Sequence, residues 1–264
     1  MILDGQVGIV TGSGQGIGRA IAVRLAQEGA DIGIVEVNAE TATETARQIE
    51  ALGRRAVVSV ADVSEPDQVS NAVAAVVGAF GRLDILVNNA GIEKMQPFLE
   101  ITSSDWERQV DVNLSGTFYC TQAAGREMVK RGYGRIVNLS SVAGLMGPLD
   151  LVPYSTVKAG IVGFTRAAAV DLADYGITVN AIAPGPIQTD LLARVWTADA
   201  LRERAQHAPI ARLGTVEEIA HAALFFASPD SGFISGTTLA IDGGAVAAGS
   251  YMVEKYRRRK AAAT

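Results

Sequence analysis

The sequence predicts an α/β protein with a parallel sheet covered by helices, and two observations carry this prediction. Seven short runs rich in Val and Ile alternate with longer segments of helical periodicity along the chain. The runs are mostly continuously apolar, which is typical of parallel strands buried on both faces. Right-handed crossovers between such strands give a doubly wound sheet that binds ligands at the carboxyl ends of its strands.

The seven runs have the length and β-branched composition of strands, and apolar residues recur at helical spacing between them. The expected strands span residues 7–10, 32–36, 56–60, 85–87, 135–139, 178–182 and 238–241. The expected helices lie near residues 16–28, 40–52, 66–79, 103–131, 154–175 and 215–227. This order of elements predicts a seven-stranded parallel sheet with helices on both faces.

Two segments fall outside the alternation. Residues 188–212 are expected to form a helical insertion, which acts as a substrate lid or, alternatively, is a surface excursion. Residues 245–264 extend the chain beyond the last strand. Because no linker, low-complexity segment or repeat divides the sequence, residues 1–264 are expected to form a single domain.

Composition limits the classes of function. The chain has 264 residues, 48% of them hydrophobic, so a large core can be buried. A net charge of −5 without a basic stripe in the main body makes nucleic acid a poor partner. No apolar run approaches the roughly 18 residues that span a membrane, and no signal-peptide pattern follows Met1. Cys120 is the only cysteine, which excludes an internal disulfide and favours a cytoplasmic location.

A glycine-rich turn follows the first predicted strand and opens the first helix. It reads Thr-Gly-Ser-Gly-Gln-Gly-Ile-Gly over residues 11–18. Glycines let the backbone approach a pyrophosphate, and the free N–H groups of the helix N-terminus bind its charge. The turn therefore predicts a doubly wound Rossmann domain that binds a dinucleotide. The expected contacts are Gly12, Ser13, Gln15, Gly16, Ile17 and Gly18.

The second predicted strand ends at Glu36, which indicates the choice of dinucleotide. A carboxylate at this place can accept both hydroxyls of the adenosine ribose. It would repel the 2′-phosphate of NADP by roughly 4 kcal/mol per unit charge at 4 Å and an effective dielectric near 20. Neither Gln15 nor the neighbours Val37 and Asn38 supply a compensating cation. The sequence therefore favours NAD.

Further short motifs follow one another along the chain. After residues 11–18 they are Asp62-Val63, Asn88-Asn89-Ala90-Gly91, Asn113, Ser141, Tyr154-Ser155-Thr156-Val157-Lys158 and Pro184-Gly185. Each motif alone is found in many unrelated proteins, but seven of them in this order and strand context are specific to one family. On this basis the chain resembles the short-chain dehydrogenase/reductase family up to about Gly244. The resemblance implies that Asp62 binds the adenine amino group and Val63 the ring. It also implies cofactor contacts at Asn89, Ala90, Gly91, Pro184, Gly185, Ile187 and Thr189.

Tyr154 and Lys158 lie four positions apart at the start of a helix, so their side chains share a face. A phenol with a pKa near 10 is too weakly ionised to act as a base at neutral pH, but the lysine ammonium and an oxidised nicotinamide both favour the phenolate. Tyr154 is therefore the expected acid/base, and the resemblance implies that Lys158 also binds the nicotinamide ribose.

Two further residues complete the expected catalytic set. Ser141, at the end of the fifth strand, can hydrogen-bond the substrate oxygen, and the family spacing to Tyr154 selects it over Ser140. The resemblance implies that Asn113 holds a water that links Lys158 to solvent. Alternatively, a buried Asn113 only satisfies backbone groups.

The substrate site is expected from residues after Gly91, residues 142–153 and the insertion. Most of the candidates are apolar, which favours a substrate with a hydrocarbon part or a sugar face. They are Glu93, Met95, Ser141, Met146, Leu149, Val152, Pro186, Leu191, Leu192 and Trp196. Glu93 and Asp150 are acidic, and either is a candidate to orient a hydroxylated or cationic substrate. No clustered His, Cys or carboxylate spacing suggests a metal, and His207 and His221 are interpreted as ordinary helix residues.

These features together predict an NAD(H)-dependent oxidoreductase that moves a hydride between nicotinamide and a secondary alcohol or ketone, such as an alcohol, a polyol or a sugar-like molecule. One alternative is a reductase of 3-oxoacyl thioesters on a carrier protein. Another, of a different class, is a non-catalytic NAD-binding regulator. We also expect a homotetramer in which the C-terminal tail crosses a subunit interface, anchored by Tyr251, Met252 and Tyr256, while the basic residues 257–260 meet acidic surface on a neighbour.

Overall fold

The computed structural model describes residues 1–189, 197, 205–206 and 208–249. Its seven strands form one parallel sheet in the order β3-β2-β1-β4-β5-β6-β7, which confirms the predicted architecture. The strands are β1 (Val7–Thr11), β2 (Asp31–Glu36), β3 (Ala56–Val60), β4 (Ile85–Asn88), β5 (Gly134–Leu139), β6 (Ile177–Pro184) and β7 (Thr238–Ile241). The strand order reverses between β1 and β4, the place where a doubly wound sheet binds its ligand.

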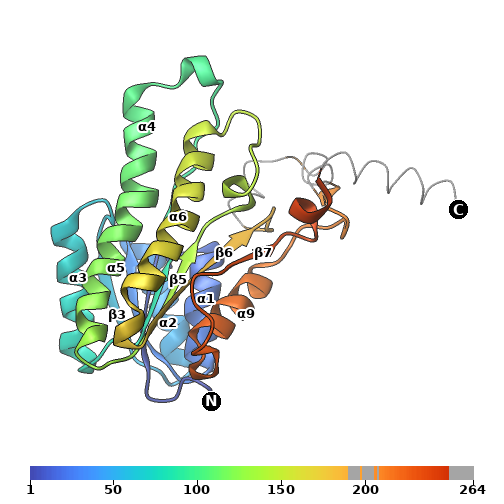
Figure 1. Ribbon diagram of the computed structural model, residues 1–264. Helices are drawn as coiled ribbons and strands as arrows, with labels where there is room; N and C mark the ends of the chain where they lie inside the picture. The colour runs from blue at the N-terminus through green and yellow to red at the C-terminus, as the bar shows by residue number, and fades with distance from the viewer. Residues whose placement is uncertain (190–196, 198–204, 207, 250–264) are drawn as a thin grey trace, which may run out of the picture.

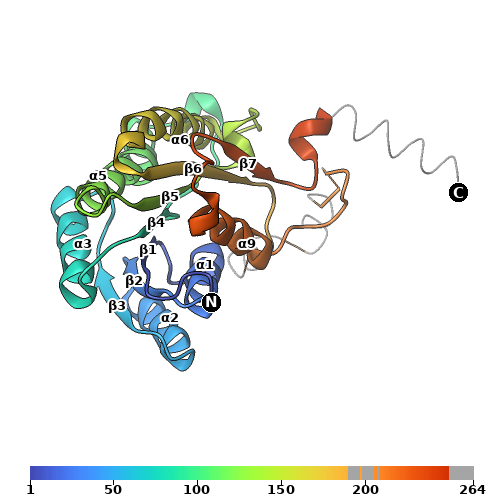
Figure 2. The ribbon, with the colours of Figure 1, turned by 60° about the horizontal axis from the view of Figure 1, so that its bottom comes forward.

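Helices cover both faces of the sheet (Figures 1 and 2). They are α1 (Gly16–Gln27), α2 (Ala39–Ala51), α3 (Pro66–Phe80), α4 (Ser103–Val110), α5 (Gly116–Val129), α6 (Val152–Asp171) and α9 (Val216–Ala227). Figure 2 shows α1, α2 and α9 on one face and α3, α5 and α6 on the other. Each face buries its own cluster of aliphatic side chains, so the strands are apolar on both sides as the sequence indicated.

Local sequence explains where several helices begin. The side chain of Asn38 caps α2 by accepting hydrogen bonds from the next turn. Thr215 and Glu218 form a reciprocal capping box at the start of α9. Pro153 stands in the first turn of α6, where its missing N–H would have no helical partner. Tyr154 follows it directly and is therefore held at the first turn of this helix.

The single helix expected over residues 103–131 is interrupted. A π-helical turn, Asp111–Ser115, separates α4 from α5. The expected helix is therefore present, with a π-helical turn in its middle that carries Asn113. Such π-turns are frequent at functional sites.

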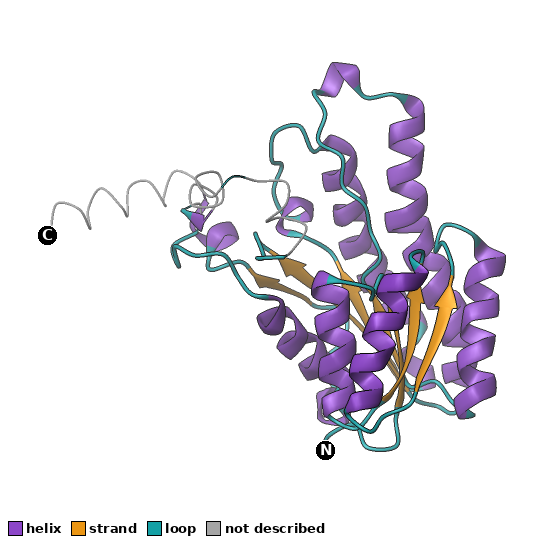
Figure 3. Cartoon of the chain, turned by 180° about the vertical axis from the view of Figure 1, so that it is seen from behind, coloured by secondary structure: helices purple, strands orange, loops and turns teal. Residues whose placement is uncertain are grey.

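The strand arrows point to one edge of the sheet, where the longest loops gather (Figure 3). We call this the carboxyl edge. The residues predicted to bind cofactor and substrate follow the ends of β1, β2, β3, β4, β5 and β6 and so converge there. Within the described part of the chain, no helix is long and apolar enough to span a membrane, and no group of three or more His, Cys, Asp or Glu side chains is arranged to hold a metal.

Candidate functional site

The glycine-rich turn after β1 is docked against the end of β4. The side-chain amide of Asn89 donates hydrogen bonds to the carbonyl oxygens of Thr11 (3.0 Å) and Gly12 (2.9 Å). The Thr11 hydroxyl accepts from the backbone N–H groups of Asn89 and Ala90, both at 3.0 Å. The side chain of Asn89, a predicted cofactor contact, also holds the turn. This network aligns the turn with β4.

The turn has the shape of a cradle for a charged group. Gly12 has a φ of 61°, and a Cβ there would lie 2.8 Å from the Cα of Ala90, so only glycine fits. Ser13 is buried, and its hydroxyl donates to the carbonyl of Val10 at 2.8 Å. Gln15, at the N-cap of α1, makes no side-chain capping bond. The first N–H groups of α1 therefore have no side-chain cap and suit a pyrophosphate.

Glu36 lies beside this turn at the end of β2. One carboxylate oxygen accepts the N–H of Gly14 at 2.9 Å, and the other accepts those of Val37 at 3.0 Å and Asn38 at 3.2 Å. A carboxylate has about four acceptor positions, so capacity remains for a ribose hydroxyl. The carboxylate is thus held in a fixed orientation by backbone amides before any ligand binds.

Arg19 is a cation near the turn that the sequence analysis did not consider. Its guanidinium donates to the carbonyl of Gly14 and to the hydroxyl of Thr45, the latter at 3.0 Å. Gly14 is thereby held between Arg19 and Glu36. The signal was present in the sequence, because Arg19 directly follows Gly18 at the start of α1, but its direction depends on how α1 packs against α2.

Asp62 follows β3 and is paired with a residue of α4. It accepts hydrogen bonds from the N–H and hydroxyl of Ser64 and from Arg108, whose Nη2 lies 2.8 Å from a carboxylate oxygen. Burial favours the neutral acid, but the bonds from Ser64 and Arg108 outweigh it and hold the pKa of Asp62 below its ordinary value. Val63 is buried against Gly116, the first residue of α5. Arg108 was missed because nothing in the sequence links it to Asp62.

Asn113 is fully buried in the π-helical turn, and its side chain is satisfied by backbone groups. Its Nδ2 donates to the carbonyls of Ile92 (3.0 Å) and Gln109 (2.9 Å), and its Oδ1 accepts the N–H of Ile92 at 3.3 Å. A Cβ on Gly91 would lie 2.6 Å from this Oδ1 and 3.5 Å from the Nζ of Lys158. Asn113 therefore ties the loop after β4 to the π-helical turn, at a place where the loop passes close to Lys158.

The two serines after β5 have different partners. The hydroxyl of Ser140 is buried and donates to the carbonyl of Lys158 at 2.8 Å. The hydroxyl of Ser141 accepts the N–H of Ala143 at 3.1 Å and forms a hydrogen bond with Tyr154. Ser140 thus packs the strand against α6, whereas Ser141 lies next to the phenol.

Tyr154 and Lys158 share one face of α6, as their spacing predicted. The Nζ of Lys158 is 5.4 Å from the ring centre of Tyr154 and donates to the carbonyl of Leu139 at 2.8 Å. Burial lowers the pKa of Lys158 to about 8, partly opposed by the negative charge of Glu93. The lysine is thus a buried cation held on the backbone of β5, one helical turn from the tyrosine.

In the protein without cofactor, the pKa of Tyr154 is raised above its ordinary value of 10. Burial, as the largest cause, and the carboxylate of Glu93 together raise it to about 12, while the hydrogen bond with Ser141 acts in the opposite direction. In the protein alone, burial and the charge of Glu93 outweigh the lowering effect of Ser141 on this pKa. The phenol is therefore neutral at pH 7 and can act as a proton donor.

The segment after β6 returns over the glycine-rich turn. Gly185 donates its N–H to Ile241 at 2.9 Å and packs against Asp242. Ile187 is buried and pairs with Gly214 in an isolated parallel bridge. The Cγ2 of Thr189 lies 3.6 Å from where a Cβ on Gly16 would stand. Pro184 to Thr189 and the turn thus face each other across the carboxyl edge.

Four of the apolar side chains predicted for the substrate site lie exposed. Those with at least a third of their surface exposed are Met95, Met146, Leu149 and Val152. Glu93 is also exposed, and Pro186 is half-buried. Leu191, Leu192 and Trp196 lie outside the described residues, as do the anchors predicted in the tail.

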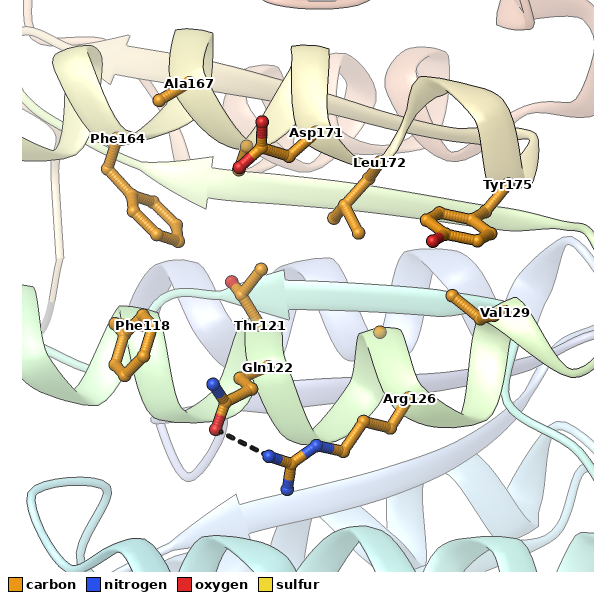
Figure 4. Close-up of a pocket in the computed structure, with 12 residues that line it drawn as sticks. Phe118, Thr121, Gln122, Arg126, Val129, Phe164, Ala167, Asp171, Leu172 and Tyr175 are labelled. Atoms are coloured by element: carbon orange, nitrogen blue, oxygen red, sulfur yellow. Dashed lines mark hydrogen bonds between the residues drawn. The ribbon is translucent and has the colours of Figure 1, made fainter.

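A separate groove of about 530 Å³ lies between α5 and α6 (Figure 4). Figure 4 shows Phe118, Phe164, Leu172 and Tyr175 lining it. None of the residues predicted for cofactor, substrate or catalysis is among its lining residues. It is therefore distinct from the site at the carboxyl edge.

Comparison with known proteins identifies relatives of this chain. A family model described as Enoyl-(Acyl carrier protein) reductase matches residues 12–246. The chain is 42% identical over 249 residues to a subunit of (2S)-[(R)-hydroxy(phenyl)methyl]succinyl-CoA dehydrogenase from Thauera aromatica, covering 92% of this chain and 98% of that protein. It is 40% identical over 246 residues to a 3-oxoacyl-[acyl-carrier-protein] reductase from Synechocystis, covering 92% and 98%.

Among solved structures, levodione reductase matches with a TM-score of 0.90 and 36% identity, covering 94% of this chain and 100% of that one. The fold, the order of the motifs and these relatives agree over nearly the whole described chain. The protein therefore belongs to the short-chain dehydrogenase/reductase family of oxidoreductases, which bind a nicotinamide cofactor.

Proposed function

We propose that the protein transfers a hydride between NAD(H) and a secondary alcohol or ketone, with Tyr154 as the acid/base. The observation that carries this proposal is the cluster of Ser141, Tyr154 and Lys158 beside the glycine-rich turn. The hydroxyl of Ser141 bonds the phenol, and the buried ammonium lies 5.4 Å from its ring. Such a set provides a binding group for the substrate oxygen, a proton carrier and a fixed positive charge.

The proton moves between the substrate oxygen and Tyr154. When bound, the nicotinamide supplies the hydride acceptor or donor. In oxidation, the hydroxyl held by Ser141 gives its proton to the Tyr154 phenolate while the carbinol C–H bond breaks and its electron pair leaves with the hydride. In reduction, the neutral phenol protonates the forming alkoxide. Lys158 orients the cofactor ribose and stabilises the phenolate, and Asn113 holds Ile92 and Gly91 against Lys158.

The proposed cofactor contacts are those predicted from the sequence. The cradle at Gly12 and the uncapped start of α1 fit a pyrophosphate, and the orientation of Glu36 fits the adenosine ribose. Asp62 and Val63 would contact the adenine, with Arg108 holding Asp62 in place. Ala90, Gly91, Pro184, Gly185, Ile187 and Thr189 would cover the nicotinamide half.

We expect Glu36→Gln to reduce discrimination against NADP by up to about 1000-fold, because it removes a charge that opposes a 2′-phosphate by roughly 4 kcal/mol at 4 Å. The amide oxygen can still accept the N–H of Gly14, whereas the amide nitrogen cannot replace the oxygen that accepts the N–H groups of Val37 and Asn38. Arg19 remains as a nearby cation. Glu36→Ala should show the same relaxation and also weaken NAD. The ratio of kcat/KM for NAD and NADP measures the effect, and a wild type that already prefers NADP would contradict the assignment.

We also expect kcat/KM for alcohol oxidation to rise with pH through one ionisation of the Tyr154–Lys158 unit. In the protein alone the pKa of Tyr154 is about 12, so the base form is scarce at neutral pH. The ammonium of Lys158, together with the positive charge of oxidised nicotinamide, should lower the pKa of Tyr154 in the complex. A profile that stays flat from about pH 6 to about pH 10, with hydride transfer shown to be rate-limiting, would rule out this unit as the base.

A reductase of 3-oxoacyl thioesters on a carrier protein is the second candidate. The Synechocystis relative, with 40% identity, favours it. The carboxylate of Glu36 opposes the NADP that we associate with such enzymes. A non-catalytic regulator is disfavoured by the close arrangement of Ser141, Tyr154 and Lys158.

A substrate screen tests the proposed function. Secondary alcohols, polyols, hydroxy acids, hydroxysteroids and 3-oxoacyl thioesters are offered with NAD(H) and with NADP(H), and the near-ultraviolet absorbance of reduced nicotinamide is followed. Oxidation of alcohols with NAD supports the main candidate. Activity confined to thioesters with NADPH supports the second, and a lack of turnover throughout would favour the regulator.

The remaining expectations from the sequence stay proposals. We propose a cytoplasmic homotetramer that acts on a small-molecule substrate without nucleic acid or membrane partners. We further propose a single domain; the lid predicted over residues 188–212 and the extension over residues 245–264 lie largely outside the described residues. Light scattering of the purified chain tests the oligomeric state.

A further inference from the structure

The loop between β4 and α4, residues 91–102, is anchored on both sides of Glu93. On one side, Asn113 bonds both the N–H and the carbonyl of Ile92, at 3.3 Å and 3.0 Å. On the other side, Asp105 accepts hydrogen bonds from Lys94 at 2.7 Å and from Gln96 at 3.0 Å. The position of Glu93 in the loop is therefore set by its neighbours.

A second loop, which carries Ser141 and leads to Tyr154, is linked to the first. The N–H of Gln96 donates to the carbonyl of Asp150 at 2.9 Å. Asp150 has a φ of 61°, and no other non-glycine residue among those described has a positive φ. A backbone held in this unusual conformation is typical of functional sites. The link keeps the loop with Glu93 and the loop before Tyr154 together.

Glu93 lies near the reacting groups. Two residues before it, Gly91 approaches Lys158, since a Cβ there would lie 3.5 Å from Nζ. The carboxylate of Glu93 raises the pKa of both Tyr154 and Lys158, which means that its negative charge acts on both. The residue is exposed.

We propose that Glu93 is a specificity-determining residue that selects alcohols with a hydrogen-bond donor beside the reacting carbon, namely a second hydroxyl or an ammonium group. It would disfavour alcohols with a carboxylate at that position. The proposal rests on the proposed function, because it concerns an alcohol held at Ser141 and Tyr154. A carboxylate accepts charge-assisted hydrogen bonds and repels anions. The apolar neighbours Met95, Met146, Leu149 and Val152 provide no such acceptor.

The test compares four substrates on one ring scaffold: cyclohexanol, cyclohexane-1,2-diol, 2-aminocyclohexanol and 2-hydroxycyclohexanecarboxylate. If the screen finds a better ring alcohol, the same substituents are compared on that ring. The kcat/KM of each derivative is divided by that of the parent alcohol for the same enzyme, which cancels differences in active fraction. Glu93→Gln should lower the relative kcat/KM of the amino alcohol by about 10- to 100-fold, lower that of the diol less, and raise that of the hydroxy acid.

Two matched variants sharpen the result. Glu100→Gln removes the same charge from an exposed position at the far end of the loop and should leave the ratios unchanged. Asp150→Asn removes the other nearby carboxylate, and asparagine tolerates the left-handed backbone. Thermal melting and NADH binding show whether each variant is folded.

The outcomes distinguish a failure of the proposed role of Glu93 from a failure of the proposed function. Unchanged ratios in Glu93→Gln, with parent alcohol oxidation retained, overturn the role of Glu93 and leave the proposed function standing. The same holds if Asp150→Asn, and not Glu93→Gln, shifts the ratios. A wild type that prefers the hydroxy acid also overturns the role of Glu93. A wild type that oxidises no alcohol in the screen contradicts the proposed function and the inference with it.

Discussion

Tyr154→Phe should lower the turnover of alcohols by about 10²- to 10⁴-fold, because the substitution removes only the group that carries the proton. The phenylalanine ring fills the same space on α6, and the buried Lys158 keeps its bond to Leu139. Binding of NADH should therefore stay within a few-fold of the wild type. Steady-state kinetics and fluorescence titration with NADH measure the two quantities separately.

Tyr175→Phe is the matched control for this substitution. It removes a phenolic hydroxyl at the groove between α5 and α6, away from the carboxyl edge (Figure 4). We expect it to leave turnover unchanged. Near-normal turnover in Tyr154→Phe would disprove the acid/base assignment, whereas equal losses in both variants would indicate a general defect.

Lys158→Met should abolish most activity and, at neutral pH and below, make the fold more stable. Burial lowers the pKa of Lys158 from an ordinary value of 10.5 to about 8. At about 1.4 kcal/mol per pKa unit, keeping the lysine charged in the folded protein costs about 3 kcal/mol. Methionine fills a similar volume and carries no charge. The catalytic cation is therefore expected to reduce stability.

The sign of this effect can be checked through its pH dependence. A group with a lowered pKa in the folded state contributes its full stability above its unfolded pKa of 10.5 and loses it as the pH falls through about 8. The stability advantage of Lys158→Met should thus be largest below about pH 8 and shrink by about 3 kcal/mol as the pH approaches 10.5. Denaturant unfolding at several pH values measures it. A stability advantage of Lys158→Met that does not change with pH would contradict the lowered pKa of Lys158.

The order of elements could be predicted because its signals are local. Each strand is a short apolar run and each helix a longer periodic pattern, so all seven strands were identified with errors of at most a few residues at their ends. The same local spacing placed Tyr154 and Lys158 on one face of α6. The need for glycine at position 12 could also be predicted from local sequence, because the turn after β1 requires its positive φ.

The interruption of the helix at Asn113 could not be predicted in this way. Local periodicity runs through residues 103–131 without a break, and the π-helical turn accompanies hydrogen bonds between Asn113 and Ile92, which is 21 positions away. The pairing of Asp62 with Arg108 spans 46 positions and has no local signal either. Contacts of this kind exist only once the loops at the carboxyl edge have been brought together.

The sequence by itself determined the sheet, the glycine-rich turn and the identity of the residues at the carboxyl edge, because periodicity, turn chemistry and motif order are properties of neighbouring residues. The tertiary structure alone decided their electrostatic state. It showed that burial and the charge of Glu93 raise the pKa of Tyr154. It also showed that Ser140 bonds the backbone of α6 and that Arg19 lies at the turn beside Glu36. Desolvation and charge interactions depend on distance in space, and distance along the chain does not reveal it.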